Sequence, residues 1–201
     1  MRKFRNLFSR LFQGKESPDL KLFRKSTGGK RYDIDLPNYL TRFFKDGRAG
    51  RERCDAYSLY SYYSKRGTGY GRGTGYGPGK LCAIYADAAY SFILFKDEEP
   101  IASIGFNPEG NSILIRQIQG VKGKQEELRC LRWEKMLLQI VIDWTRRNKF
   151  RKVRIIRSVD SGWYRDCDKE RCERMYLKYD VTARRMGFVY DEKRKVYSLS
   201  L

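Results

Sequence analysis

The sequence contains no histidine among its 201 residues. Histidine is the commonest general base of enzymes and the commonest metal ligand, so its absence excludes the most frequent designs of both kinds of site. No run of eighteen apolar residues occurs, and we expect no transmembrane helix. Cysteines are few and widely spaced, without the two close pairs of a zinc ribbon, so no metal site is expected. They are Cys54, Cys82, Cys130, Cys167 and Cys172.

The cysteines also bear on the compartment. Their odd number, their wide spacing and the lack of a secretory signal predict reduced thiols in an intracellular, cytoplasmic protein. The basic N-terminus leaves import into an organelle open.

Positive charge is what the sequence has in excess, because 43 Lys and Arg face 24 Asp and Glu, for a net charge of +19. Such an excess repels itself in a compact chain unless it meets counterions, which makes a polyanion the expected partner. Nucleic acid is the leading candidate, since binding to phosphates releases condensed counterions. An anionic membrane surface or a phosphorylated cofactor would use the same side chains. A basic bias that only aids solubility is the alternative.

Residues 1–15 form a basic amphipathic pattern with five apolar side chains at helical spacing and no acid. Such a helix suits a membrane surface, docking to a protein partner, or an organelle presequence. It could equally fold back onto its own domain. Residues 16–79 follow as a helical extension, in which Leu36–Phe44 have the clearest helical pattern.

Two groups of residues in this basic chain are candidates for contact with nucleic acid. Residues 66–77 repeat the unit RGTGYG, whose glycines predict a flexible loop. Its cations and rings suit phosphate contact and base stacking, with a solvated linker as the alternative. These side chains are Arg66, Tyr70, Arg72 and Tyr76. A second cluster follows the predicted long helix, where cations also favour a helix C-terminus. It consists of Arg146, Arg147, Lys149, Arg151 and Lys152.

Residues 80–201 have the pattern of a dense α/β (α+β) domain: a mixed, mostly antiparallel sheet flanked by helices. Strands are expected at 81–86, 90–96, 101–106, 112–118 and 153–157. A long helix is expected at 128–148, and a second helix ends near Met186. A terminal hairpin of 188–190 and 196–199 closes the domain.

This order of elements resembles the GNAT-type N-acetyltransferase superfamily over residues 80–201. The hairpin YSFILFKDEEPIASIGF, the run IRQIQGVKGK and the tail TARRMGFVYDEKRKVYSL carry the likeness. The resemblance implies a GNAT-like fold and acetyl-CoA as cofactor, with its pyrophosphate held after a strand by main-chain N–H groups and lysines. The residues implied are Gln119, Gly120, Val121, Lys122, Gly123 and Lys124.

The sequence departs from the family pattern at two points. The second glycine of the loop comes one residue late, and Ala183 stands where the family has its general-acid tyrosine. Tyr179, one turn earlier on the same helical face, is the remaining candidate. Three acids in predicted turns, Glu98, Glu99 and Glu109, are not distinguished as bases.

Two hypotheses therefore stand beside each other. The first is transfer of an acetyl or acyl group from acyl-CoA to an amine on a nucleic-acid-associated substrate. The alternative is a non-catalytic GNAT-like module that binds nucleic acid or belongs to a nucleoprotein complex. A membrane-surface protein anchored by residues 1–15 is a third reading.

Overall fold

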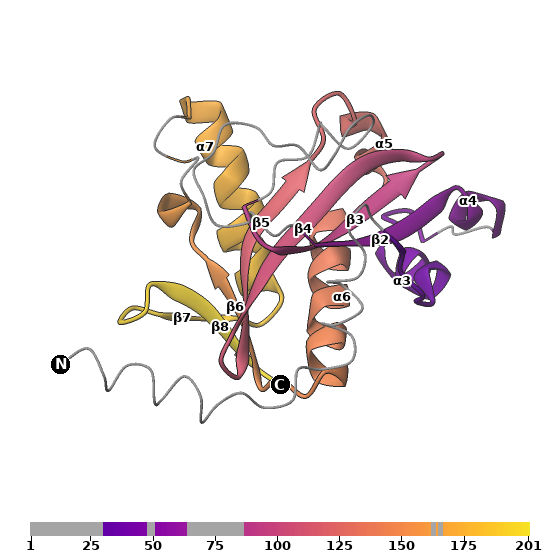
Figure 1. Ribbon diagram of the computed structural model, residues 1–201. Coiled ribbons are helices and arrows are strands. Elements are labelled where there is room, and N and C mark those ends of the chain that lie inside the picture. The colour runs from indigo at the N-terminus through magenta and orange to yellow at the C-terminus, as the bar shows by residue number, and fades with distance from the viewer. Residues whose placement is uncertain (1–29, 48–50, 64–86, 162–163, 165–166) are drawn as a thin grey trace.

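The computed structural model describes residues 30–47, 51–63, 87–161, 164 and 167–201 (Figure 1). They form one eight-stranded sheet in the order β1-β2-β3-β4-β5-β6-β8-β7. All neighbouring strands are antiparallel except β5 and β6, which run parallel. The mixed, mostly antiparallel sheet expected from the sequence is confirmed. The expectations for residues 1–15, for the loop 66–77 and for a strand at 81–86 lie outside the described residues.

From β1 to β6, strands that follow one another in the sequence are neighbours in the sheet. They are β1 (Lys30–Arg31), β2 (Tyr57–Tyr63), β3 (Tyr90–Lys96), β4 (Glu99–Glu109), β5 (Ser112–Gly120), β6 (Lys152–Ile156), β7 (Val189–Asp191) and β8 (Val196–Ser200). The segment 57–63 was expected within the helical extension of residues 16–79, but it is a strand that pairs with β3 over its whole length.

The helices lie between these strands. They are α3 (Leu36–Phe43), α4 (Arg51–Asp55), α5 (Gln125–Arg129), α6 (Trp133–Arg147), α7 (Lys169–Tyr176) and α8 (Thr182–Arg185), with the short 3-10 helix η2 (Ser158–Asp160) after β6. The single helix expected over 128–148 is wrong at its start, because α5 ends at Arg129 and α6 begins at Trp133. Between α7 and α8 the helix widens into a π-helical turn, η3 (Leu177–Val181).

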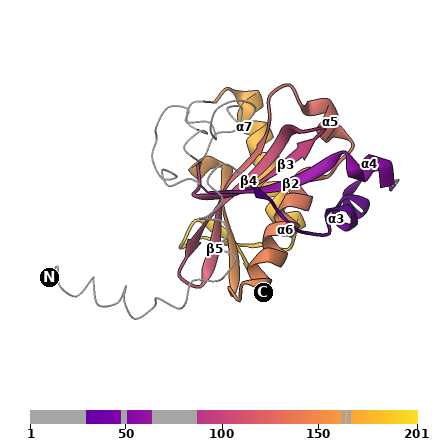
Figure 2. The same ribbon diagram turned by 45° about the vertical axis from the view of Figure 1, so that its right-hand side comes forward.

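Helix α6 contributes eight of the buried residues of the main core. Its apolar side chains, among them the fully buried Trp144, pack on the sheet against Phe92 and Phe106. Figures 1 and 2 show α3 and α4 beside α6 and β2, and α3 contacts both. Asp35 caps α3 by accepting a hydrogen bond from the N–H of Asn38.

The opposite face of the central strands is also buried. Ile93, Phe95 and Val121 form a second, smaller apolar cluster with Tyr60 and Tyr62. Six of the seven residues of β3 are buried, which explains why its sequence is nearly continuous in apolar side chains. The sheet is thus covered on both faces where β4 and β5 lead into the candidate site.

Candidate functional site

The parallel strands β5 and β6 separate soon after they begin. Over the described chain they pair only between Ser112–Ile115 and Lys152–Ile155, although β5 continues to Gly120. Figure 1 shows the two strands diverging towards their C-terminal ends, with the segment from α7 to α8 between them. From Arg116 onward, no strand within the described residues pairs with this edge of β5. We call this place the β5/β6 opening.

A β-bulge lies at the start of the opening. The pairing of β4 with β5 passes from Gly105 opposite Gln117 to Phe106 opposite Ile115, so Arg116 is an extra residue in β5. Such bulges bend a strand and redirect its groups, and they are frequent next to active sites. This one turns the main chain of β5 at the point where β6 departs.

Tyr179 fills the opening from the π-helical turn η3. Its phenol accepts a hydrogen bond from the N–H of Ile118 (2.9 Å) and donates one to the carbonyl of Arg116 (3.3 Å). The side chain is only 4% exposed. Burial raises the pKa of this phenol well above its usual value, and the hydrogen bond from Ile118 only partly offsets the effect. Tyr179 is therefore neutral near pH 7 and able to act as a donor.

Asp180, the next residue, holds the other side of the opening. Its carboxylate accepts hydrogen bonds from the N–H of Ser158 (3.0 Å), just after β6, and from the hydroxyl of Tyr197 (3.1 Å) in β8. Both Tyr179 and Asp180 are buried. Successive residues of one turn thus bind β5 on one side and the β6–β8 side on the other. We refer to them together as the Tyr179–Asp180 latch.

Asp87 and Gln117 lie at the same end of β5. The N–H of Asp87 donates to the side-chain oxygen of Gln117 (3.1 Å), whose amide nitrogen donates to Gln119 (2.7 Å). The negative charge of Asp87 is close enough to contribute to the raised pKa of Tyr179. A carboxylate, a phenol and the bulged strand are thus gathered at one place.

A cation and an acid lie where η3 meets the N-terminus of α6. Lys178 lies with its Nζ 5.6 Å from the centre of the Trp133 ring. Burial lowers the pKa of Lys178 and raises that of Glu134, and each charge partly offsets the effect on the other. A phosphate bound near the start of α6 would therefore have both a cation, Lys178, and an acid, Glu134, beside it.

The structure places the six residues implied as a cofactor loop, 119–124, at the end of β5 and in the turn that follows. Two of its main-chain donors are used internally: Val121 N–H bonds to Ile101, and Lys124 N–H bonds to Val121. The side chain of Lys124 forms ion pairs with Glu99 (3.1 Å) and Glu127 (3.3 Å). Its pKa is raised by hydrogen bonds to these two acids. Lys122 and Gly123 are exposed.

The two glycines of that loop, Gly120 and Gly123, are suited to their positions for different structural reasons. A Cβ atom on Gly120 would lie 3.1 Å from Leu128 Cδ1 and 3.5 Å from the Trp133 ring, so this glycine lets α5 and α6 pack on the strand end. Gly123 has φ +85°, a conformation that other residues adopt only with strain, and nothing lies within 4 Å of its Cβ position. Binding of a cofactor by this loop stays a prediction.

The acids left open as bases have ordinary positions. Glu99 pairs with Lys124, and Glu109 pairs with Arg154 at 2.7 Å. Glu98 lies in the β3–β4 turn with φ +61°. Ala183, at the family's tyrosine position, is fully buried. Of the candidates for acid chemistry, Tyr179 is the one that the fold brings to the opening.

Besides Arg146, four exposed cations lie at the C-terminus of α6 and the start of β6, at the end of the sheet away from the opening. They are Arg147, Lys149, Arg151 and Lys152. Among the described residues no ion pair joins them to an acid, whereas Arg146 pairs with Asp143 at 3.3 Å. The second candidate group, Arg66, Tyr70, Arg72 and Tyr76, lies outside the described residues.

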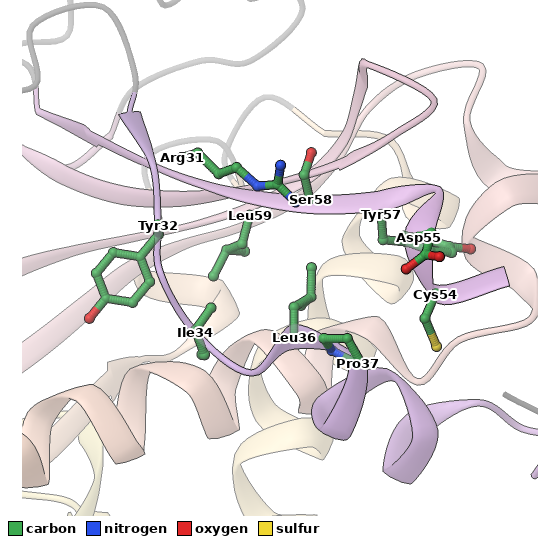
Figure 3. A pocket seen from close by; sticks show the side chains of 10 residues that line it. All are labelled: Arg31, Tyr32, Ile34, Leu36, Pro37, Cys54, Asp55, Tyr57, Ser58 and Leu59. Carbon is green, nitrogen blue, oxygen red and sulfur yellow. The ribbon is translucent and has the colours of Figure 1, made fainter. Parts of the chain in front are cut away.

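A separate cavity of about 320 Å³ lies at the β1–β2 edge, under α3 and α4 (Figure 3). Tyr32, Leu36 and Leu59 give it apolar walls, and Arg31 and Asp55 add charge. Its size is at the lower end for small-molecule sites. Three strands separate β2 from β6, so this cavity is distinct from the β5/β6 opening.

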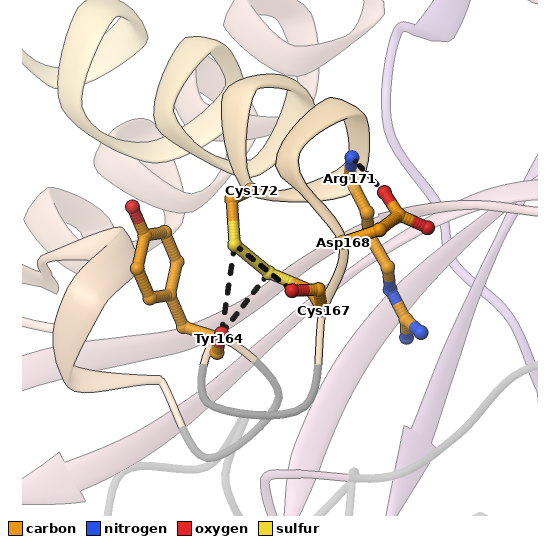
Figure 4. Close-up of a disulfide and its surroundings, with 5 residues drawn as sticks. All are labelled: Tyr164, Cys167, Asp168, Arg171 and Cys172. Carbon is orange, nitrogen blue, oxygen red and sulfur yellow. Dashed lines mark hydrogen bonds between the residues drawn. A yellow bond between two sulfur atoms is a disulfide. The ribbon is translucent and has the colours of Figure 1, made fainter.

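The thiol prediction is wrong for two cysteines. Cys167 and Cys172 form a disulfide at the start of α7 (Figure 4), with the carbonyl oxygen of Tyr164 3.0 Å from Cys167 Sγ. Four intervening residues let Cys172, in the first turn of the helix, fold back onto Cys167, and Asp168 between them caps α7. The wide spacing of the cysteines along the chain as a whole therefore did not exclude this one short loop. Cys54 and Cys130 carry free thiols.

No group of three or more potential metal-ligating side chains occurs in the part of the chain that the structure describes. None of the described helices has both the length and the apolar character needed to cross a membrane.

Asp87 and Asp180 are site residues that the sequence reasoning missed. Asp180 has one signal in the sequence: it directly follows an inward-facing tyrosine, in a helix with apolar residues on either side of this pair. Asp87 carries no such signal, because it lies in a short connection between two expected strands.

Comparison with known proteins finds likeness among solved structures alone. No family model matches the sequence, and no curated protein matches it. Among solved structures, the ribosomal-protein-S18-alanine N-acetyltransferase from Escherichia coli is 11% identical, with 55% of this chain and 67% of that chain covered and a TM-score of 0.35. A "probable" acetyltransferase of the GNAT family from Chromobacterium violaceum is 13% identical, covers 72% and 87%, and has a TM-score of 0.41.

A third similar structure is N-acetylglutamate synthase from Neisseria gonorrhoeae, which was solved with coenzyme A and N-acetyl-glutamate. It is 13% identical, with 85% of this chain and 33% of that chain covered and a TM-score of 0.30. All three of these structures have TM-scores below 0.5.

Proposed function

We propose that the protein is a GNAT-like acyltransferase, which transfers an acyl group from acyl-CoA to an amine at the β5/β6 opening. The observation that carries the proposal is the edge of β5 beside the bulge at Arg116, along which no strand of the described residues pairs. A thioester arm that contains amide groups can pair with such an edge as a short strand does. Acetyl-CoA is the simplest donor of this class.

The residues at the opening fit the chemistry of the transfer. The amine nitrogen attacks the thioester carbon, a C–N bond forms, the C–S bond breaks, and the thiol leaves with a proton. Without histidine a carboxylate must take the proton of the amine, and Asp87 is the acid at this end of β5. The N–H of Ile118 is a donor that a carbonyl oxygen of the acyl-CoA arm can use. Tyr179, whose hydroxyl lies at this edge of β5, is the candidate acid for the thiolate.

Acyl-CoA binding is tested by calorimetry on the full chain with acetyl-CoA, beside a charge-reversed variant. Lys122 is exposed and lies just after the C-terminal end of β5, at the opening. If Lys122 contacts a phosphate of the cofactor, Lys122→Glu should weaken binding about tenfold. Lys193→Glu, in the exposed β7–β8 turn, changes the net charge equally and should leave binding unchanged. An absence of binding heat in the unaltered protein refutes the proposal.

The proposed acceptor is an amine on a nucleic-acid-associated substrate, because the charge of the chain favours a polyanion. The exposed, unpaired cluster of Arg147, Lys149, Arg151 and Lys152 supports this part within the described residues. The second candidate function, a non-catalytic GNAT-like module that binds nucleic acid, rests on the same cluster and on the alanine at position 183. The two proposals differ in whether acyl-CoA is bound at all.

Binding to single-stranded RNA tests the cluster. Reversing Lys149, Arg151 and Lys152 to Glu should lower the slope of log K against log salt by about 2, because each lost phosphate contact contributes about 0.7. The matched control reverses three cations of the β7–β8 turn: Lys193, Arg194 and Lys195. Equal losses in both variants would show that general charge, and no particular surface, attracts the RNA.

A further inference from the structure

We propose that the Tyr179–Asp180 latch closes the β5/β6 opening in the ligand-free protein, and that Tyr179 must leave β5 before a ligand can pair there. This inference rests on the proposed function and adds a conformational step to it. Its basis is that one side chain holds the main-chain groups on which the binding of an amide-containing arm depends.

The phenol imitates a residue of a parallel strand. In a parallel ladder, one residue of the neighbouring strand donates to the carbonyl of one residue and accepts from the N–H two residues further on. Tyr179 makes both contacts with a single hydroxyl, to the carbonyl of Arg116 and the N–H of Ile118. These are the first main-chain groups of β5 beyond its pairing with β6 at Ile115. The phenol and a strand-like ligand therefore compete for the same positions.

The latch has a fixed side and a releasable side. Asp180 accepts two hydrogen bonds from the β6–β8 side, one of them from a main-chain N–H, and it is buried. Tyr179 contributes one hydroxyl on a long side chain, whose two contacts can be exchanged for those of a ligand. The backbone of the turn can thus remain anchored through Asp180 while the tyrosine ring rotates away from β5.

The local helix geometry supports a movable element. The turn that contains both residues is a π-helical segment between two α-helices. Turns of this kind are rare and are found often at functional sites. The hydroxyl of Thr182, the first residue of α8, also donates to the carbonyl of Leu177 in η3 (3.1 Å), a five-residue span that matches the wider turn. A return to regular α-helix would rotate Tyr179 relative to Asp180 and withdraw it from the strand.

The first measurement needs no ligand. Tyr179→Phe removes the hydroxyl and keeps the ring, so the amide of Ile118 loses its acceptor and should exchange with deuterium faster than in the unaltered protein. Tyr39→Phe is the matched control. It also removes one tyrosine hydroxyl, which donates a hydrogen bond to Asp143 (2.8 Å), but this contact lies far from the opening. It should leave the exchange of Ile118 unchanged. Unchanged exchange in Tyr179→Phe refutes the latch.

The second measurement is calorimetric binding of coenzyme A, which lacks the reactive acyl group. Because the phenol no longer competes for Ile118 and Arg116, Tyr179→Phe should bind coenzyme A about two- to tenfold more tightly than the unaltered protein and Tyr39→Phe. Equal or weaker binding by Tyr179→Phe, with the unaltered protein still binding, overturns the latch and leaves the proposed function standing. No binding by any of the three proteins refutes the proposed function itself.

Discussion

Asp180→Asn is the substitution that tests most directly how the opening is held together. The carboxylate of Asp180 accepts from two donors at once, the N–H of Ser158 at 3.0 Å and the hydroxyl of Tyr197 at 3.1 Å, and the residue is 3% exposed. Asparagine has nearly the same shape but one oxygen and one NH₂ group. With its oxygen on the N–H of Ser158, the amide places its NH₂ group opposite the Tyr197 hydroxyl, which can accept from it only by giving up its own hydrogen bond to residue 180.

The expected loss of stability follows from that mismatch. A hydrogen bond to a charged group contributes about 1.5–3 kcal/mol, and a buried donor left without an acceptor costs about 1–3 kcal/mol. Because the two terms overlap, we expect the free energy of unfolding to fall by about 2–4 kcal/mol. For a chain of this length the melting temperature should fall by about 5–12 °C.

Urea unfolding followed by tryptophan fluorescence measures the effect, since Trp144 and Trp133 lie in the core. The midpoint should shift while the slope m stays constant, because the surface exposed on unfolding is unchanged. Tyr197→Phe is the control: it removes one donor, leaves Asp180 bound to Ser158, and should cost about 1 kcal/mol. A loss below about 0.5 kcal/mol for Asp180→Asn would mean that these contacts do not hold the β6 side of the opening.

Three further predictions concern the turn after β5, the disulfide and α3. Gly123→Ala should destabilise by about 1–2 kcal/mol because of its positive φ, whereas Gly120→Ala, whose neighbour is the flexible end of a leucine, should change stability by less than about 1 kcal/mol in thermal unfolding. Cys172→Ser should cost about 2 kcal/mol, as expected for a short closed loop, and maleimide labelling without reductant should gain the thiol of its former partner. Burial, followed by the hydrogen bond to a carboxylate on α6, raises the pKa of Tyr39 to about 12, so the stability that its hydroxyl adds over Tyr39→Phe should persist below pH 10 and vanish as the pH rises from about 10 to about 12.

Strands joined by tight turns could be predicted because their evidence is local. The hairpin of β3 and β4 and the terminal pair β7 and β8 combine strand-forming side chains with short turns, and the structure has them close to the expected bounds. The segment Tyr57–Tyr63 could not be settled in the same way. Its tyrosines suit a helix face as well as a strand, and only pairing with the distant β3 decides the matter.

The opening could not be read from the sequence, since it depends on where two strands of distant segments stop pairing. The latch illustrates a second difficulty. Helical periodicity placed Tyr179 inward, and the structure confirms that it is buried, but the same periodicity turns Asp180 by about 100° from it. The π-helical turn has more residues per turn, so neighbours differ less in direction and both can face the core. Nothing in the residue pattern marks that local widening.

The distribution of charge separates the two functions proposed for the chain. Within the described residues 29 Lys and Arg face 21 Asp and Glu, against 43 and 24 in the whole chain, so +8 of the net charge of +19 lies there. Many of these cations are paired with acids, as Lys124 and Arg154 are. Most of the excess therefore belongs to the other segments, of which residues 1–15 and 66–77 are part. A polyanion would be held chiefly by those segments and the α6 end of the sheet, whereas an acyl-CoA arm depends on the uncharged main chain of β5. We therefore expect the affinity for RNA to depend strongly on salt concentration and the affinity for acyl-CoA at the opening to depend on it weakly.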